Sequence, residues 1–251
     1  MPTSTACNPE KLVVSIPILM YHQVDEPPPK GSPLRGLVVA PSSFAWQMRM
    51  LSLMGYRGLS IRDLEPYLSG EKQGKVVGIT FDDGYQNNVV NALPVLKKNH
   101  FTATCYGVSS QIGGTNAWDR GKVAKAQLMT LQDWRIWQSA GMDIGSHTQT
   151  HANLLDLSVE TARKEITSSR QELEQVIGCE VRHFCYPYGK FNQEHMQMCR
   201  EAGYRTAVTT NRGRVHVQHD HHALNRIMVA RATNPLQFLL KISTSYEDRR
   251  T

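Results

Sequence analysis

A chain of 251 residues is long enough to bury a sizeable core, either as one large α/β domain or as two small ones. Its composition is ordinary for a globular protein, with 40% hydrophobic and 20% charged residues, and its formal net charge is +6. Because the Lys and Arg residues are scattered, with no basic stripe that alternates with aromatic residues, the sequence predicts no nucleic-acid partner.

The apolar segment near the start, KLVVSIPILMYHQV at 11–24, is too short and too soon interrupted to cross a bilayer. Neither a basic leader nor a small-residue cleavage site accompanies it. We therefore expect no transmembrane segment and no export signal. This indicates a cytoplasmic protein, unless the chain is a trimmed form of a longer one.

Strands and helices are expected to alternate along the chain. The first half predicts a strand at 13–21, a loop at 25–33, a helix at 43–54, a strand at 76–81, a helix at 85–99, a strand at 102–108, a helix at 131–140 and a strand at 142–147. The second half predicts a helix at 158–177, a strand at 183–189, a helix at 194–201, strands at 205–210 and 223–229, and a last helix at 235–242.

The clearest helix is the one at 158–177. Its apolar residues recur at helical spacing and are predicted to share one face: Val159, Ala162, Ile166, Leu173 and Val176. The glycine that follows this segment fits a helix stop.

Alternating strands and helices indicate a parallel sheet covered by helices. With seven or eight strands, we expect an α/β fold in the form of a distorted (β/α) barrel of about seven strands. We expect one domain over residues 11–245, after a flexible N-terminal segment at 1–10 and before a polar tail at 246–251. In barrels of this kind, chemistry gathers at the C-terminal ends of the strands.

Polar residues follow several of the predicted strands. The apolar run at 76–81 ends in Asp82 and Asp83, and the segment GSHTQTH supplies His147 and His151. Two adjacent carboxylates after a buried strand are costly unless a nearby group uses them. One carboxylate and two imidazoles suit zinc or a similar divalent ion. An HxxxH pair alone is often a solvated helix face, but beside the two acids it favours a metal site.

The segments TFDDGY (80–85), SHTQTH (146–151) and YPYG (186–189) together resemble the polysaccharide deacetylase family with the NodB-homology domain, carbohydrate esterase family 4. The resemblance covers roughly residues 22–226. PILMYHQV and SFAWQMRMLSLMGYRGLSIRDL further resemble the branch that deacetylates poly-N-acetylglucosamine. The single domain would then be a NodB-type catalytic domain.

The resemblance implies different roles for the two acids. Asp83 would bind one divalent metal ion together with His147 and His151, while Asp82 would stay off the metal as the general base. The implied ion is Zn²⁺, with Mn²⁺, Co²⁺ or Ni²⁺ as alternatives. The glycine after the two acids would let the chain bend so that both line one pocket.

Two further catalytic roles follow from the resemblance. The backbone N–H of Tyr188 would hold the oxyanion of the tetrahedral intermediate. The leaving amine needs a proton, and His22 is our candidate for the general acid, because the branch carries a histidine on an early strand. A buried structural imidazole is the alternative interpretation of His22.

The sequence departs from the common family pattern in two motifs. Many members have an arginine that contacts the base where this chain has Cys185, and many carry the acid histidine in a late motif that here reads LNRIMV. The partner of Asp82 therefore stays open, with Arg226 as one possibility.

Other residues are candidates for the substrate site. They are Tyr85, Tyr186, Trp118 and Arg226. Trp118 would stack on a sugar ring, although an aromatic residue in a loop also serves packing. The segment HVQHDHH at 216–222 invites a second metal site, but a solvated turn is favoured.

The sequence therefore predicts a metal-dependent hydrolase that acts on carbon–nitrogen bonds other than peptide bonds. It would remove N-acetyl groups from an N-acetylglucosamine polymer or oligomer by attack of a metal-bound water. Two alternatives stay open. The same fold can act on chitin oligomers, peptidoglycan, acetylxylan or a small N-acyl compound, and a carbohydrate-binding pseudoenzyme would use the fold without catalysis.

Overall fold

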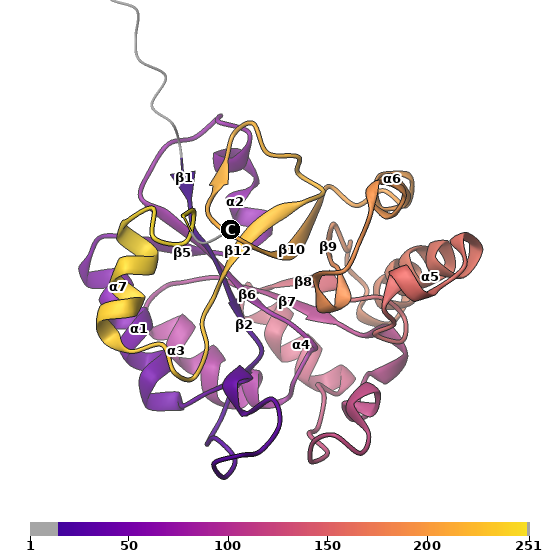
Figure 1. Cartoon of the computed structure of the whole chain (residues 1–251), viewed down its shortest axis with the longest axis horizontal. Helices are drawn as coiled ribbons and strands as arrows, with labels where there is room; N and C mark the ends of the chain where they lie inside the picture. The colour runs from indigo at the N-terminus through magenta and orange to yellow at the C-terminus, as the bar shows by residue number, and fades with distance from the viewer. Residues whose placement is uncertain (1–14, 250–251) are drawn as a thin grey trace, which may run out of the picture.

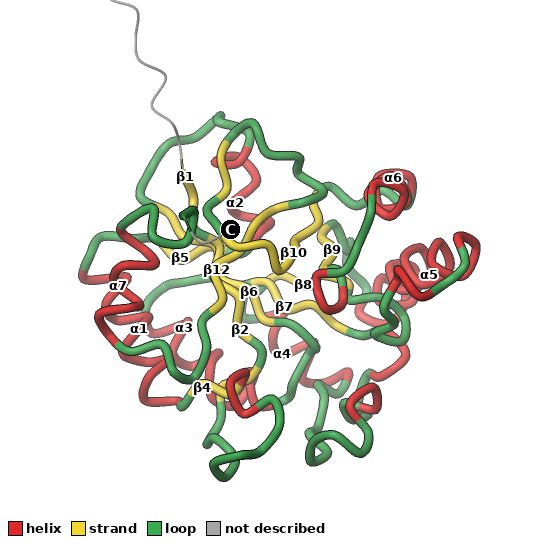
Figure 2. The backbone as a smooth tube through the Cα atoms, in the orientation of Figure 1, coloured by secondary structure: helices red, strands yellow, loops and turns green. Residues whose placement is uncertain are grey.

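Seven parallel strands close into a ring at the centre of the molecule (Figure 1, Figure 2). The structure is a computed structural model, and it describes residues 15–249. Around the ring the strands are β2 (Ile18–Tyr21), β12 (Leu224–Met228), β10 (Thr206–Arg212), β9 (His183–Cys185), β8 (Asp143–Ser146), β7 (Thr104–Gly107) and β6 (Val76–Phe81), which returns to β2. The prediction of a barrel of about seven strands is confirmed.

Strand β6 closes the ring and also pairs with an eighth strand. Along one edge it pairs with β2, from Ile18 opposite Gly78 to Tyr21 opposite Phe81. Its other edge is shared, because β5 (Arg57–Leu59) pairs with its first half and β7 with its last two residues. All six residues of β6 are buried, which fits a parallel strand covered on both faces.

Helices surround the barrel (Figure 1). In chain order they are α1 (Pro41–Leu53), α2 (Ile61–Leu68), α3 (Leu93–Lys98), α4 (Leu131–Ser139), α5 (Val159–Ile177), α6 (Gln193–Glu201) and α7 (Pro235–Ser243). Several begin at a side chain that accepts a hydrogen bond from the backbone N–H three residues on, as at Ser60, Thr130 and Ser158. These caps explain why the predicted starts of the helices at 131 and 158 lie within a residue of the observed ones.

Some predicted elements are shorter than expected, and some were not predicted. The strand predicted at 13–21 is β1 (Ser15–Ile16) and β2, separated by Pro17, and residues 13–14 lie outside the described range. The helix predicted at 85–99 is a π-helical turn at Asn88–Ala92 followed by α3. The strand predicted at 183–189 ends at Cys185, because Pro187 begins a 3₁₀ turn at Pro187–Gly189.

Within residues 15–249, five short strands lie outside the ring, and all of them except β1 were not predicted. Strand β1 pairs in antiparallel fashion with β11 (Val215–His216). Strand β3 (Gln23–Val24) pairs with β4 (Val38–Val39), which brackets the proline-rich loop predicted at 25–33. Strand β5 and helix α2 were also missed, because segments of three and eight residues carry too little periodicity.

The buried face of α5 differs from the predicted one. Val159 and Val176 are exposed, at 51% and 41% of their surface. The buried side chains are Ala162, Glu165, Ile166, Ser169, Leu173 and Ile177. The apolar pattern therefore predicted the middle of the buried face correctly, at Ala162, Ile166 and Leu173. It missed the two polar residues of that face, Glu165 and Ser169.

The C-terminal segment packs on the domain at least as far as Glu247. This residue lies within the predicted polar tail, but it is buried and pairs with Lys241 and Arg212. The predicted flexible segment at 1–10 lies outside the described residues. Within residues 15–249, no helix has the length and apolar character that a membrane span requires.

Candidate active site

The two adjacent acids follow β6 at the C-terminal end of the barrel. Asp83 and Gly84 both adopt left-handed backbone conformations, with φ of 74° and 73°. A side chain at Gly84 would also meet the ring of Trp134 at 3.0 Å, so glycine fits this bend for two reasons. The turn lets the two carboxylates reach different partners within one pocket.

Asp83 meets the two predicted histidines. Its Oδ1 lies 3.3 Å from Nε2 of His147 and 3.2 Å from Nε2 of His151, and all three side chains are buried. His147 follows β8 directly, while His151 is reached through a loop that is left-handed at Thr148 and at His151 itself. The structure thus brings together the three residues predicted to hold a metal.

The second nitrogen of each ring is held by a partner. Nδ1 of His147 lies 2.8 Å from the carbonyl oxygen of Cys185, and Nδ1 of His151 lies 3.1 Å from the hydroxyl of Tyr188. Such contacts orient imidazoles that bind metals and leave the other nitrogen free to coordinate. Both Nε2 atoms therefore point at Asp83.

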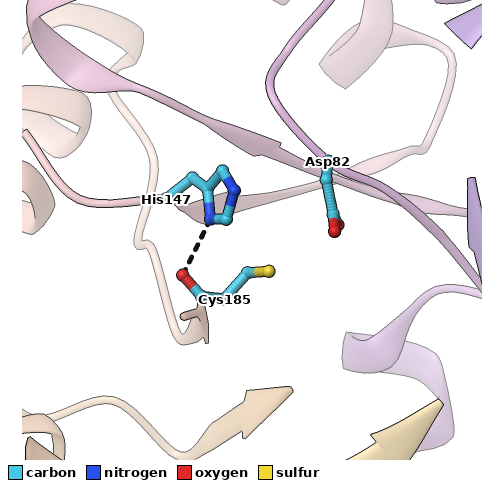
Figure 3. Close-up of side chains that lie close together, drawn as sticks. All are labelled: Asp82, His147 and Cys185. Carbon is cyan, nitrogen blue, oxygen red and sulfur yellow. Dashed lines mark hydrogen bonds between the residues drawn. The ribbon is translucent and has the colours of Figure 1, made fainter. Parts of the chain in front are cut away.

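Asp82, His147 and Cys185 form a second group of ligand types that lie close together (Figure 3). This group fits a metal poorly. The thiol of Cys185 lies 3.3 Å from the guanidinium of Arg226, whose positive charge would repel a cation. Burial also raises the pKa of Cys185, which keeps it a thiol, whereas metals bind the thiolate. The donor set that fits a divalent ion is Asp83, His147 and His151.

Both carboxylates are held in the ionised form. Burial opposes the charge of Asp83, but hydrogen bonds with His147 and His151 outweigh it and lower its pKa well below the ordinary value. Burial likewise opposes the charge of Asp82, and the charge and hydrogen bonds of Arg226 outweigh it, so the pKa of Asp82 is also lowered.

Arg226, on β12, is the partner of Asp82. Its two terminal nitrogens donate to the two carboxylate oxygens at 2.6 and 2.7 Å, and its Nε donates to the carbonyl of Thr209. Arg226 is 1% exposed. The guanidinium therefore lies against Asp82 and away from the surface, and the prediction that Arg226 binds substrate stays a prediction. The structure supports the other possibility, that Arg226 is the partner of Asp82.

His22 lies at the end of β2 on the other side of Asp82. Its Nε2 is 4.0 Å from Oδ2 of Asp82, and its side chain is 17% exposed. Its backbone carbonyl accepts a hydrogen bond from Asn88. The imidazole thus reaches the pocket of the two acids and retains access to solvent.

Aromatic residues surround the histidines. Trp118 stacks on the ring of His151 with centroids 4.4 Å apart, and Tyr188 packs edge-on against the same ring at 4.7 Å. Tyr188 is half-exposed and has a left-handed backbone, with φ of 59°. Trp118 therefore packs on the ring of His151, and its predicted stacking on a sugar ring stays a prediction.

The two tyrosines predicted to bind substrate lie in different places. Tyr85 is buried but lines the cleft that contains Asp83. Tyr186 is fully buried, stacks on Phe191 and donates its hydroxyl proton to the carbonyl of His222. Tyr186 is therefore buried in the core in this structure, and its role as a substrate contact stays a prediction.

A cleft of about 480 Å³ opens beside Asp83. Its walls come from the loops at 23–38 and 116–126. Asp119, which the sequence reasoning missed, lines this cleft and is largely buried. Burial and the nearby charge of Asp83 raise its pKa. No motif marks Asp119, because its neighbours in sequence are loop residues.

The histidine-rich segment at 216–222 forms no metal group in the described part of the chain. The rings of His216 and His219 pack edge-on at 5.2 Å, and no third ligand type converges on them. The favoured interpretation as a turn between β11 and β12 agrees with the structure.

Comparisons with known proteins agree with these motifs. The sequence model of a family described as polysaccharide deacetylase matches residues 69–207. YxkH of Bacillus subtilis is 30% identical over 217 residues, which cover 86% of this chain and 71% of that protein. The poly-beta-1,6-N-acetyl-D-glucosamine N-deacetylase of Staphylococcus epidermidis is 28% identical over 84% of this chain and 78% of its own length.

A solved structure has the same fold. The deacetylase PplD of Streptococcus pyogenes, in complex with acetate, superposes with a TM-score of 0.80 at 28% identity. The match covers 92% of this chain and 99% of that one.

Proposed function

The chain belongs to the polysaccharide deacetylase family, and from this premise we propose that it removes N-acetyl groups from N-acetylglucosamine units of a polysaccharide. The similarity to the Staphylococcus epidermidis enzyme favours a β-1,6-linked polymer. The observation that carries the proposal is the separation of the two acids. Asp83 faces two imidazoles, while Asp82 faces a guanidinium and His22.

Asp83, His147 and His151 would hold one divalent ion, with zinc favoured by the two nitrogen ligands and one oxygen ligand. When bound, such an ion polarises the acetamide carbonyl and lowers the pKa of water toward about 7. Ligands from only three side chains leave room for water and substrate. This arrangement is typical of catalytic sites and differs from closed structural ones.

Asp82 is the proposed general base. Arg226 keeps its carboxylate ionised and fixes both oxygens, so it can accept a proton from the attacking water. Attack on the carbonyl carbon gives a tetrahedral oxyanion, for which the backbone N–H of Tyr188 is the proposed donor. His22 would then protonate the sugar nitrogen as the carbon–nitrogen bond breaks, which releases acetate and a free amine.

Acetate release tests the reaction and its substrate. The full chain loaded with one equivalent of Zn²⁺ should release acetate from β-1,6-linked N-acetylglucosamine oligomers faster than from chitin oligomers, peptidoglycan fragments or acetylxylan. Asp82→Asn should keep the ion and lose about 10²- to 10⁴-fold in turnover, the usual range for general acid–base catalysis.

Two results would contradict parts of the proposal. Release from another substrate alone would overturn the polymer assignment and leave the mechanism standing. Loss of the ion in Asp82→Asn together with its retention in Asp83→Asn would show that the roles of the two acids are reversed.

A further inference from the structure

The loop that carries the second histidine has an unusual backbone. Within residues 147–151, Thr148 and His151 have left-handed backbones, with φ of 66° and 63°. Neither is glycine, and a β-branched residue such as Thr rarely adopts this region. A loop with two such residues persists only where its surroundings fix it. The hydrogen bond from the N–H of His151 to Oγ1 of Thr148 is one such constraint within the loop.

Glu165 fixes the same loop from outside. One of its oxygens, Oε2, accepts the backbone N–H groups of Gln149 and Thr150, both at 2.9 Å, and Oε1 accepts the hydroxyl of Thr150 at 2.7 Å. These two residues are the centre of the loop between the two histidines. The carboxylate therefore holds the backbone that sets the distance from one ring to the other.

The position of Glu165 is costly for the fold. It lies on the buried face of α5, which runs beside β8 on the outside of the barrel (Figure 1), and it is 7% exposed. None of the ion pairs that Lys and Arg form within residues 15–249 includes it. A buried carboxylate without a cation depends on its hydrogen bonds, and all three donors come from this loop.

Glu172, two turns further along α5, provides a comparison. It accepts hydrogen bonds from the hydroxyl of Ser109 and the side-chain amide of Gln149, both at 2.5 Å. It therefore contacts side chains of the loop region, whereas Glu165 contacts the loop backbone. Removing Glu172 leaves both backbone bonds to Glu165 in place.

We propose that Glu165 is a positioning residue for the metal centre, which holds residues 149–150 so that His147 and His151 direct their Nε2 atoms at one point beside Asp83. The inference rests on the metal site of the proposed function. It adds a residue from a helix outside the barrel, beyond the ligands and their direct partners. Its effect should appear in metal affinity and in the geometry of the bound ion, in addition to activity.

The test is Zn²⁺ affinity, measured in the full chain by competition with a chromophoric chelator at a temperature at which circular dichroism shows every variant folded. Glu165→Ala should bind Zn²⁺ about 10- to 100-fold more weakly, the usual cost of losing a partner that orients metal ligands. Glu165→Gln should bind within about threefold of the wild type, because its amide oxygen still accepts both backbone N–H groups. Glu172→Ala should also stay within about threefold, because it disturbs no backbone bond of the loop.

A second measurement reports geometry. The visible absorption of bound Co²⁺ should change in Glu165→Ala and match the wild type in Glu165→Gln and Glu172→Ala. If Glu165→Ala does not fold, Glu165→Asp takes its place. It keeps the charge but withdraws the carboxylate by one methylene, and it should weaken Zn²⁺ binding by about 3- to 10-fold, a part of the full loss.

The outcomes separate this inference from the proposed function. Wild-type affinity and spectrum in Glu165→Ala or Glu165→Asp would overturn the positioning role and leave the metal site intact. An equal loss in Glu172→Ala would also overturn it, because general packing of α5 would then explain the effect. A wild-type chain that binds no Zn²⁺ at all would overturn the metal site itself.

Discussion

Histidines and carboxylates cluster at both ends of the barrel, and the two clusters have different geometries. At the C-terminal ends of the strands, one oxygen of Asp83 lies within 3.3 Å of the Nε2 atoms of both His147 and His151. At the opposite end, Nε2 of His183 lies 3.5 Å from Glu65 and 3.7 Å from Asp143. His183 and Asp143 are the first residues of β9 and β8.

We call Asp83, His147 and His151 the upper cluster and His183, Glu65 and Asp143 the lower cluster. The lower cluster has similar residue types but lacks the features of a metal site. His183 is fully buried, with Nδ1 held by the hydroxyl of Thr206, and Asp143 accepts a hydrogen bond from Thr104. In the part of the chain that the structure describes, its ligand atoms are not among the groups that converge within 4.8 Å. The convergence of the ligand atoms, more than residue type, therefore distinguishes the upper cluster.

Replacing one histidine at each end gives the largest predicted contrast. His151→Ala removes one of three ligands, so Zn²⁺ affinity should fall by more than the roughly 10- to 100-fold that loss of an outer partner costs. His183→Gln keeps a side chain that can bond Thr206, and its Zn²⁺ content should stay at that of the wild type. Elemental analysis of the two variants after dialysis measures the Zn²⁺ that each retains.

Either of two results would break this contrast. Full metal occupancy and activity in His151→Ala would remove that residue from the site. Metal loss in a folded His183→Gln would mean that the lower cluster, and not the upper one, holds the ion.

His22 offers a second contrast, because its Nε2 faces Asp82, which is not one of the three residues predicted to hold the ion. His22→Ala should keep its ion and its fold but lose most deacetylation of an N-acetyl sugar. An amine is a poor leaving group unless it is protonated, whereas the phenolate of an aryl acetate departs as a stable anion. Turnover of an aryl acetate should therefore fall far less.

The ratio of the two losses decides the role of His22. Equal losses on the amide and on the ester would indicate a packing or orienting role. No loss on either substrate would leave the general acid to another residue of the cleft.

The sequence predicted the barrel because its signals are local. Buried runs such as that of β6, and helix caps such as Ser158, are visible within a few residues. Strand β5 was missed, because it has only three residues and pairing between distant segments leaves no periodic mark.

The candidate site shows the same limit. Asp82, Asp83, His147 and His151 were recognisable because they occur in compact motifs after strands. The pairing of Arg226 with Asp82 spans 144 residues, so sequence offered it only as one option. Tyr186 lies within a motif of the site and yet is buried in the core, where it follows the end of β9 and stacks on Phe191. Glu165 could have been noticed, because it is a charged residue on the apolar face of a helix. The search for apolar periodicity considered only the hydrophobic residues.

The smallest predicted effect concerns the lower cluster and its dependence on pH. Burial lowers the pKa of His183 below its ordinary value of 6.5, against the opposite influence of Asp143 and Glu65. The folded state therefore holds a neutral imidazole. Above pH 6.5 the ring is neutral in both states, so its contribution is constant. As the pH falls below 6.5, the unfolded chain takes up the proton first, and stability is lost until the folded ring also titrates.

Thermal unfolding of the metal-free protein between pH 7 and pH 5 measures this contribution. His183→Gln cannot titrate, so its Tm should fall less steeply than that of the wild type. The difference should be a few degrees, because about 1 kcal/mol moves Tm by about 2–4 °C in a domain of this size. The imidazoles of the upper cluster are present in both proteins and cancel in the comparison. A steeper fall in His183→Gln would mean that Glu65 and Asp143 stabilise a charged His183, as in a buried ion pair. Charge interactions in the lower cluster would then hold β8, β9 and α2 together. Burial would no longer be the dominant influence on the pKa of His183.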